Sequence, residues 1–366
     1  MKRLYYPQGE SIDWTYIESV VLKDYASKMK GTPVTISGSQ KTIDAWTLTV
    51  GVCETLVHLP SYKALPERKQ KELFLAALLM SIAQDQRSRR RRACHDVRSF
   101  LCREYGLAGS AEALWLRETV CSLVSHRHLP LAIVDSPGEE QHLRFVAAEA
   151  DLNKDYNWEL QCVLAEAMIR SMDSEYIHRE LPTLDYCRER AKELGCYTSP
   201  YQYRDAHTRF MSFYWYPQIE ESRIVNDTWG EVVIVCGLPG TDREAYILKN
   251  YPHLPIIRLS GDEEEMAPDK LETPEMMESG EMKRLMACLA VHQPCVVTGD
   301  FVSSLSRSGI VGICHNQKAM IRIVWLESSW EETVKHAPDR SMLEDLLPKV
   351  DLPHLFEADN VEWKWI

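Results

Sequence analysis

The spacing of apolar positions changes once along this chain. From about Asp13 to Lys192 apolar residues recur every three or four positions. In residues 70–84 this spacing places Leu75, Leu78, Leu79 and Ile82 on one face. Residues 157–172 follow the same pattern. The spacing therefore predicts a largely helical N-terminal half.

After Thr228, short runs rich in β-branched residues alternate with helical segments. Buried strands are predicted at 231–236, 255–260, 294–300 and 320–327, and an amphipathic helix is predicted at 274–293. This alternation is typical of an α/β domain with a parallel sheet. The two patterns meet in an aromatic, turn-rich stretch at 196–230. We therefore expect an α-helical domain at 1–215 and an α/β domain at 216–366.

Composition adds limits to this picture. The chain has 366 residues, of which 45% are hydrophobic, which is enough for two domains of ordinary size. A net charge of −12 argues against general coating of nucleic acid, so any polyanion site must be local. The eleven cysteines never form C-x-x-C, which disfavours a disulfide framework or zinc cluster and fits a reducing cytoplasm. No signal-peptide core and no run of about 18 apolar residues is found, so we expect a soluble cytoplasmic protein without a membrane partner.

The segment 232–252, "VVIVCGLPGTDREAYILKNYP", has the form of a phosphate-binding loop between a strand and a helix. Gly237, Pro239 and Gly240 keep the turn. Working loops of the form G-x-x-x-x-G-K-[ST] use backbone N–H groups and a lysine for phosphate and a hydroxyl for magnesium. Here Asp242 replaces the last glycine, Arg243 the lysine and Glu244 the hydroxyl. Two carboxylates at a helix start repel phosphate, so the loop is predicted to be vestigial, with Gly237, Pro239, Gly240 and Arg243 as its remnant anion site.

Four segments of the C-terminal half together resemble a known family. These segments read "GLPGTDRE", "IIRLSGDEEEM", "VVTGDFVSSLSRSG" and "DLPHLFEADNVEW". They are similar to the P-loop polynucleotide kinase domain of bacterial two-domain RNA or DNA end-healing enzymes, in which an HD-type phosphohydrolase precedes the kinase. The resemblance implies an ATP- and Mg²⁺-dependent 5′-kinase fold. The family's general-base aspartate is displaced here to Asp262, and its arginine-rich lid is reduced to Arg340. Arg243, Asp262 and Arg340 are thus the remaining candidates for catalysis. ATP with Mg²⁺ is the cofactor that the resemblance implies, for a loop whose motif is degenerate.

The N-terminal half departs from the same family in a parallel way. HD phosphohydrolases hold metal through convergent histidines and aspartates, because hard cations need oxygen and imidazole ligands. The family's His-Asp pair falls on Met80 and Ser81, and its first histidine falls on Leu48. The candidate metal ligands that remain are His95, His126 and Asp151. Two histidines within a helical core are also expected as ordinary structural residues.

An arginine run interrupts this otherwise acidic chain. It consists of Arg87, Arg89, Arg90, Arg91 and Arg92 and follows the apolar helix that ends near residue 84. A cluster of this density is the strongest local site for phosphate in the chain. We therefore expect either contact with RNA or DNA ends or, as the alternative, a solvated loop.

Two sites of independent chemistry have each lost several essential groups while the apolar patterns around them remain. Core substitutions commonly destabilise by about 1 kcal/mol or more, so retained cores indicate a retained fold. The sequence is therefore interpreted as a pseudoenzyme of the HD/polynucleotide kinase type that acts by binding or regulation. A divergent P-loop kinase or ATPase acting on RNA or DNA ends is the first alternative. A structural partner of an active paralogue is the second.

Overall fold

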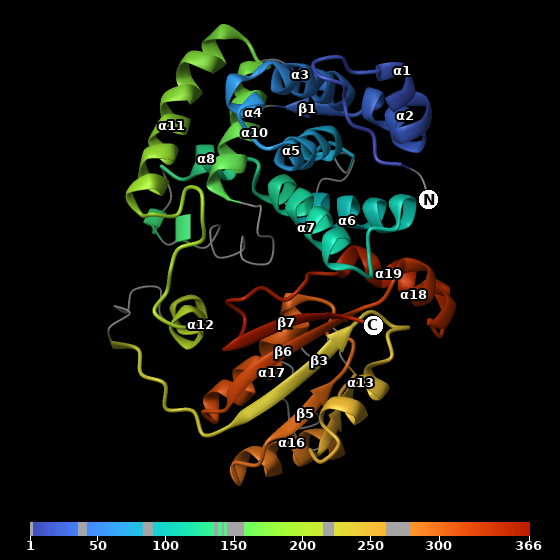
Figure 1. Cartoon of the computed structure of the whole chain (residues 1–366), viewed down its shortest axis with the longest axis vertical. Helices are drawn as coiled ribbons and strands as arrows, with labels where there is room; N and C mark the ends of the chain where they lie inside the picture. Colours follow the sequence, from blue (N-terminus) through green and yellow to red (C-terminus); the bar gives the residue numbers. More distant parts are fainter. Residues whose placement is uncertain are drawn as a thin grey trace. The chain divides into compact units, whose positions relative to one another are not determined.

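The computed structural model describes residues 3–35, 42–82, 91–134, 138–140, 143–144, 157–214, 223–260 and 279–366 (Figure 1). It divides into two compact units. The N-terminal unit comprises Met1–Leu107 and Leu114–Tyr201, and the C-terminal unit comprises Ala108–Ala113 and Gln202–Ile366.

The N-terminal unit is built from helices, as the apolar spacing predicts. Its longer helices are α2 (Lys23–Gly31), α3 (Ala45–His58), α5 (Glu67–Leu79), α6 (Arg91–Tyr105), α7 (Ala111–His126), α10 (Trp158–Arg170) and α11 (Ser174–Glu193). Short elements complete it: α1 (Trp14–Tyr16), the π-helix η1 (Ile17–Val21), α4 (Pro60–Lys63), α8 (Leu129–Ala132), and the antiparallel strands β1 (Pro33–Thr35) and β2 (Thr42–Asp44).

Helix α10 is the buried centre of this unit. Asn157 caps its start by accepting a hydrogen bond from the Leu160 N–H at 3.0 Å. Buried residues lie on all sides of the helix, so it packs against α3, α5, α8 and α11 at once. A helix that is apolar all round must be enclosed by others. Trp158 fills the first turn and is fully buried.

The C-terminal unit contains a five-stranded parallel sheet in the order β4-β5-β3-β6-β7. The strands are β3 (Glu231–Gly237), β4 (Ile256–Arg258), β5 (Cys295–Thr298), β6 (Met320–Glu327) and β7 (Asn360–Trp365). The helices are α12 (Ala206–Tyr214), α13 (Arg243–Asn250), α16 (Gly280–Ala290), α17 (Ser304–Asn316), α18 (Trp330–His336) and α19 (Arg340–Leu346), followed by the 3-10 turn η3 (Leu347–Lys349). The mixed α/β class and the parallel sheet are thus confirmed.

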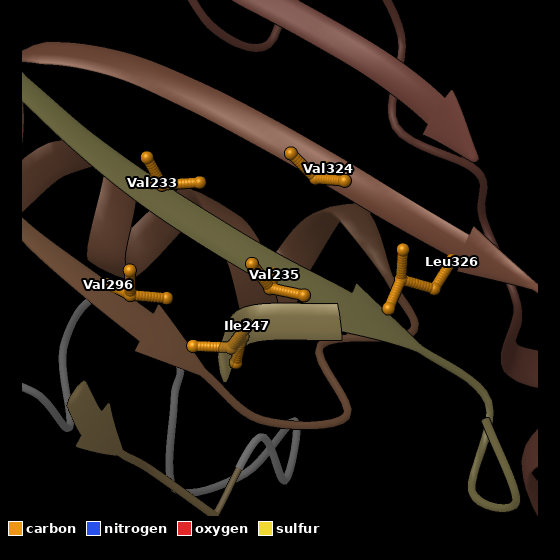
Figure 2. Packing of buried hydrophobic residues seen from close by; sticks show 6 residues of the cluster. All are labelled: Val233, Val235, Ile247, Val296, Val324 and Leu326. Atoms are coloured by element: carbon orange, nitrogen blue, oxygen red, sulfur yellow. The ribbon is translucent and has the colours of Figure 1, made fainter. Parts of the chain in front are cut away.

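One face of the sheet packs against α13. Val233 and Val235 of β3, Val296 of β5 and Val324 of β6 form an apolar cluster that receives Ile247 (Figure 2). Because all five strands are parallel, their carboxyl ends share one edge of the sheet. The loops that follow β3, β5 and β6 are therefore brought together at that edge.

Helix α12 belongs to the C-terminal unit, although the sequence pattern places it before the predicted join. The imidazole of His207 is hydrogen-bonded to the carboxylate of Asp359, whose other oxygen accepts the Ile321 N–H at 2.7 Å. Phe210 of the same helix is fully buried. These contacts tie α12 to β6 and to the residue before β7, so the long continuous part of the C-terminal unit begins at Gln202.

We expect the His207–Asp359 contact to make the stability of the C-terminal unit depend on pH. The hydrogen bond to Asp359 raises the pKa of His207 above its usual 6.5. A raised pKa means that the contribution is complete below about pH 6.5 and is lost as pH rises through the folded value. Urea unfolding of wild type and His207→Gln at several pH values measures it: the difference between them should shrink as pH rises above about 6.5.

His315 lies near His207, and its pKa is shifted in the opposite direction. Burial lowers the pKa of His315, so its own contribution has the opposite pH dependence. The charge of His207 also contributes to the lowered pKa of His315, so both curves are measured in a His315→Gln background, where His315 does not titrate. A difference that is constant with pH would show that the His207–Asp359 contact is not an ion pair.

Candidate site at the carboxyl edge of the sheet

The loop after β3 keeps the glycines of a phosphate-binding loop because they pack against neighbouring backbone. A Cβ on Gly237 would lie 2.5 Å from the carbonyl oxygen of Leu326 in β6. Gly240 has φ = +97°, and a Cβ there would overlap the Thr333 carbonyl oxygen and lie 2.9 Å from the Ala337 nitrogen. Close packing against neighbouring backbone therefore explains why both positions are glycine, without any ligand.

Backbone N–H groups of this loop are already engaged. The Thr241 N–H donates to the Leu238 carbonyl at 3.1 Å, and the Arg243 N–H donates to the Thr241 carbonyl at 2.9 Å. The Asp242 carboxylate accepts the Ala245 N–H at 3.0 Å and caps α13. A phosphate cradle needs such N–H groups to point at the ligand. Here protein oxygens occupy at least three of them.

Arg243 is held by the protein at the position expected for the phosphate-binding lysine. Its Nη1 lies 2.7 Å from the Gly237 carbonyl oxygen and 2.7 Å from Oδ1 of Asp300. Both side chains are mostly buried, with 21% and 18% of their surfaces exposed. The guanidinium thus bridges the ends of β3 and β5 as an internal ion pair.

Glu244, which replaces the magnesium-binding hydroxyl, is also committed elsewhere. Its carboxylate pairs with Arg258 at the end of β4, with Nε and Nη2 of the arginine 2.7 and 3.0 Å from its two oxygens. This bidentate pair is exposed and joins α13 to the edge strand of the sheet. The Glu244 carboxylate therefore points toward β4, where it makes a structural contact.

A cavity of about 760 Å³ opens at this edge of the sheet. It lies within the C-terminal unit and is lined by the loop after β3, by residues that follow β5, β6 and β7, and by α18 and α19. We call it the edge cavity; its lining residues are Pro239, Gly240, Thr241, Asp242, Arg243, Asp300, Ser328, Glu332, His336, Pro338, Met342 and Ile366.

The charge of the edge cavity is unfavourable for phosphate. Asp242, Asp300 and Glu332 contribute three carboxylates, whereas Arg243 is the single arginine in the lining. Arg243 is neutralised by Asp300, and His336 lies 3.0 Å from Glu332. Lys335 also pairs with Glu332 at 3.3 Å, so Asp242 supplies the negative charge that an anionic ligand would meet beside these ion pairs.

The other residues predicted for catalysis are not brought to this cavity by the described part of the chain. Arg340 begins α19, is strongly exposed, and pairs with Glu344 of the same helix at 3.1 Å. It does not line the edge cavity. Asp262 lies outside the described residues. Sequence reasoning overlooked Asp300, whose signal is its position directly beyond the buried strand β5.

The positions that the family resemblance assigns to HD-type metal ligands are buried. Leu48, Met80 and Ser81 are all buried, and the Ser81 hydroxyl has no hydrogen-bond partner among the described residues. His95 lies on α6 and His126 ends α7, and both are partly exposed. Asp151 falls outside the described part of the chain. Within that part, no group of three or more His, Cys, Asp or Glu side chains could hold a metal ion.

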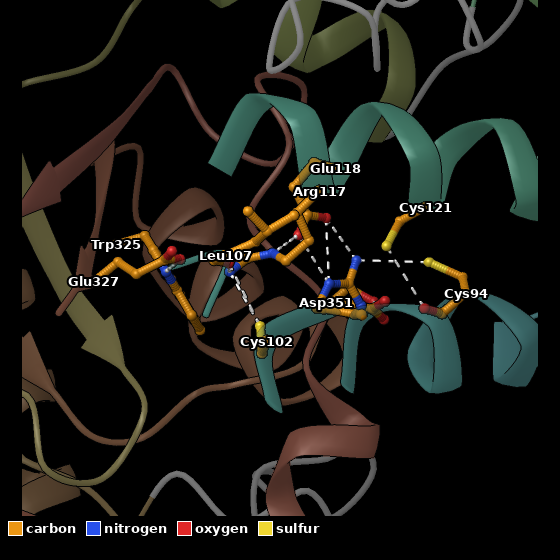
Figure 3. Close-up of polar contacts among 11 residues, drawn as sticks. Cys94, Cys102, Leu107, Arg117, Glu118, Cys121, Trp325, Glu327 and Asp351 are labelled. Atoms are coloured by element: carbon orange, nitrogen blue, oxygen red, sulfur yellow. Dashed lines mark hydrogen bonds and ion pairs between the residues drawn. The ribbon is translucent and has the colours of Figure 1, made fainter. Parts of the chain in front are cut away.

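A buried charge cluster, not foreseen from the sequence, joins α6 and α7. Glu118 lies between two guanidinium groups, with Arg98 Nη2 2.7 Å from its Oε2 and Arg117 Nε 2.6 Å from its Oε1 (Figure 3). Burial raises the pKa of Glu118, but the two arginines outweigh burial and lower it to about 2. Arg117 also donates to the Leu107 carbonyl at 2.8 Å. This cluster is an ionised structural network.

The arginine run cannot be placed by the structure. Arg87, Arg89 and Arg90 lie outside the described residues. Arg91 and Arg92 open α6, but their side chains are not among those described. Contact of the run with nucleic acid stays a prediction.

Comparison with known proteins adds no relative: no protein-family model matches the chain, and no curated protein matches its sequence. None of the helices in the described residues combines the length and apolar character needed to cross a bilayer.

Proposed function

We propose that this chain is a catalytically inactive relative of the HD-phosphohydrolase/P-loop polynucleotide kinase end-healing proteins, and that it acts by binding or regulation. The observation that carries the proposal is the bridge from Arg243 to Asp300 and the Gly237 carbonyl. Arg243, the cation at the position of the phosphate-binding lysine, is already paired within the protein.

The charges explain why such a site fails with ATP. Phosphoryl transfer depends on positive groups and a metal ion that neutralise the charge developing on the phosphoryl oxygens. A triphosphate would have to displace Asp300 from Arg243 and would then face the freed carboxylate together with Asp242. Glu244 stands at the position of the magnesium-binding hydroxyl, and its carboxylate is paired with Arg258. The position of the magnesium-binding hydroxyl therefore offers no free group to Mg²⁺.

The N-terminal unit supports the same proposal. A bridging carboxylate and two imidazoles are replaced by side chains that provide no charge: Ser81, Met80 and Leu48. Buried cores that are kept while the groups needed for both chemistries are absent favour a role in binding. The ligand on the N-terminal side is proposed to be an RNA or DNA end or a protein partner, including an active paralogue.

We expect purified protein to transfer no phosphate from radiolabelled ATP to RNA or DNA oligonucleotides with 5′-hydroxyl ends. The missing lysine and hydroxyl each remove direct stabilisation of the transition state, and loss of one such donor alone costs about 10²–10³ in rate. Gel analysis of the oligonucleotides measures product. Arg243→Ala is the matched control for contaminating kinase, because a contaminant is unaffected by it. Turnover present in wild type and absent in Arg243→Ala would contradict the proposal.

A further inference from the structure

Strand β7 forms one edge of the parallel sheet and has no partner strand on its outer side in the described residues (Figure 1). Its single neighbour there is β6. The unpaired backbone N–H and C=O groups of an edge strand can pair with a strand of another chain. At the carboxyl end of β7, 44% of Trp365 and 49% of Ile366 are exposed. The outer edge of β7 is therefore a candidate interaction surface.

The direction of each backbone group in β7 follows from one hydrogen bond. The N–H of Ile366, directly after the strand, donates to the Glu327 carbonyl of β6 at 3.1 Å. Backbone groups of successive residues in a strand point to opposite sides. Every second residue before Ile366 therefore faces β6, whereas Val361, Trp363 and Trp365 direct their N–H and C=O groups to the outer edge. The indole N–H of Trp363 adds a buried donor that has no hydrogen-bond partner in the described part of the chain.

The side chains of β7 are complementary to those of a second β7 that runs antiparallel to it. With a two-fold axis through Trp363 and normal to the sheet, Glu362 lies opposite the second copy's Lys364, and Lys364 opposite its Glu362. Val361 then lies opposite the second copy's Trp365, and pairs of β-branched and aromatic residues stabilise a sheet. Because side chains alternate between the faces, other registers shift the axis by two-residue steps in the pairing, to Glu362 or to Lys364. Those registers place like charges opposite each other, so charge selects the register with Trp363 on the axis.

The contacts within the chain leave these charges available to a second copy. Glu362 pairs with Arg322 of β6, and Lys364 lies 2.7 Å from Glu362. The Lys364 side chain is still 45% exposed, so it can also contact a carboxylate opposite it. A lysine on an edge strand usually opposes pairing with unrelated strands. Here it is compatible with a strand that carries a glutamate opposite it, as a second copy of β7 does.

We propose that two copies of this chain associate through antiparallel pairing of their β7 strands, with Trp363 on the two-fold axis. The two Trp363 residues exchange backbone hydrogen bonds with each other, and Val361 exchanges them with the second copy's Trp365. The two five-stranded sheets thereby become one continuous sheet. The pairing does not involve the loop after β3, so a monomeric wild type leaves the inactive-kinase proposal standing.

The test is sedimentation velocity of the full chain over a range of micromolar concentrations. The wild-type mass should rise with concentration from that of one chain toward that of two. Trp365→Pro removes an N–H at the outer edge and keeps the hydrogen bonds to β6, and proline is tolerated at such edge positions. Because each copy loses a hydrogen bond to the other, association should weaken about tenfold or more. Trp365→Phe is the matched control: it keeps the N–H and an aromatic ring and should associate within about threefold of wild type.

A pair of charge variants tests the register. Glu362→Lys places lysines opposite each other in the pair of strands, and Lys364→Glu places glutamates opposite each other. Each variant alone should associate about tenfold or more weakly than wild type. An equal mixture should recover association, because the lysines of one variant then face the glutamates of the other. Lys283→Glu is the control for changed net charge: Lys283 is exposed on α16, which packs against β4 and β5, and its substitution should leave association unchanged.

Three outcomes would overturn the proposed pairing. The first is a wild type that stays monomeric at every concentration, which would leave the edge of β7 to a strand of a different protein. The second is association of Trp365→Pro as strong as that of wild type, which would place the contact elsewhere. The third is a mixture of the two charge variants that does not associate although circular dichroism shows both to be folded. If a charge variant does not fold, the comparison of Trp365→Pro with Trp365→Phe decides.

Discussion

Glu118→Ala is expected to lower the free energy of unfolding of the N-terminal unit by about 3–5 kcal/mol, because it leaves two buried guanidinium groups without their counter-charge. Arg98 and Arg117 are both almost fully buried, so water cannot take the place of the carboxylate. Urea unfolding followed by circular dichroism measures the loss. A folding yield too low to measure is the stronger form of the same result.

Two further variants distinguish lost charge from lost packing. Glu189→Ala removes an exposed carboxylate paired with Lys192 and should change stability by less than about 1 kcal/mol. Replacing the whole cluster, with Arg98→Met, Arg117→Met and Glu118→Leu together, should recover much of the stability lost in Glu118→Ala. If Glu118→Ala costs no more than the exposed control, the cluster is not an ionised network.

Arg307→Leu is expected to have a comparable effect on the C-terminal unit, with a loss of about 3–5 kcal/mol. Arg307 of α17 is fully buried, and its Nε and Nη2 lie 2.7 and 2.9 Å from the two oxygens of Glu357. Its Nη1 donates at 2.9 Å to the carbonyl of Phe301, a residue with φ = +43°. The arginine thus holds the segment that follows Asp300 in place and also forms a buried ion pair with Glu357.

The control for Arg307 is Arg284→Leu. Arg284 lies on α16, is half exposed and pairs with Glu281 at 2.7 Å, so its removal should cost less than about 1 kcal/mol. Arg307→Lys should fall between the two, since an ammonium cannot reproduce the bidentate contact. Chemical denaturation of the three variants under one set of conditions measures this order. A loss below about 1 kcal/mol in Arg307→Leu would contradict the assigned role of the ion pair.

The sequence predicts most of the sheet because burial on both faces leaves a clear pattern. Strands β3, β5 and β6 are continuous apolar runs and lie within a residue or two of their predicted bounds. Strand β7 was not predicted, although "NVEWKW" alternates apolar and charged residues and carries two tryptophans, which is the local pattern of a half-buried strand. Its place at the edge of the sheet beside β6 is a non-local feature that the local pattern does not contain.

The site was predictable only in part. The altered residues Asp242, Arg243 and Glu244 are visible in the sequence, and the structure shows each of them in a protein contact. The partner of Arg243 could not be predicted, because Asp300 is far away along the chain and is brought near by the parallel order of β3 and β5. Arg98 and Glu118 likewise form a pair only through the packing of two helices.

We propose that the Arg243–Asp300 ion pair occupies the position that a nucleotide's phosphates take in a working loop. Isothermal titration calorimetry of the full chain with MgATP tests this most directly, with Asp242→Gly, Arg243→Lys and Glu244→Ser combined in a variant that restores the three lost groups. We predict no saturable binding of MgATP to wild type up to millimolar concentration and measurable binding to the restored variant. Saturable micromolar binding to wild type that is lost in Arg243→Ala would contradict the account.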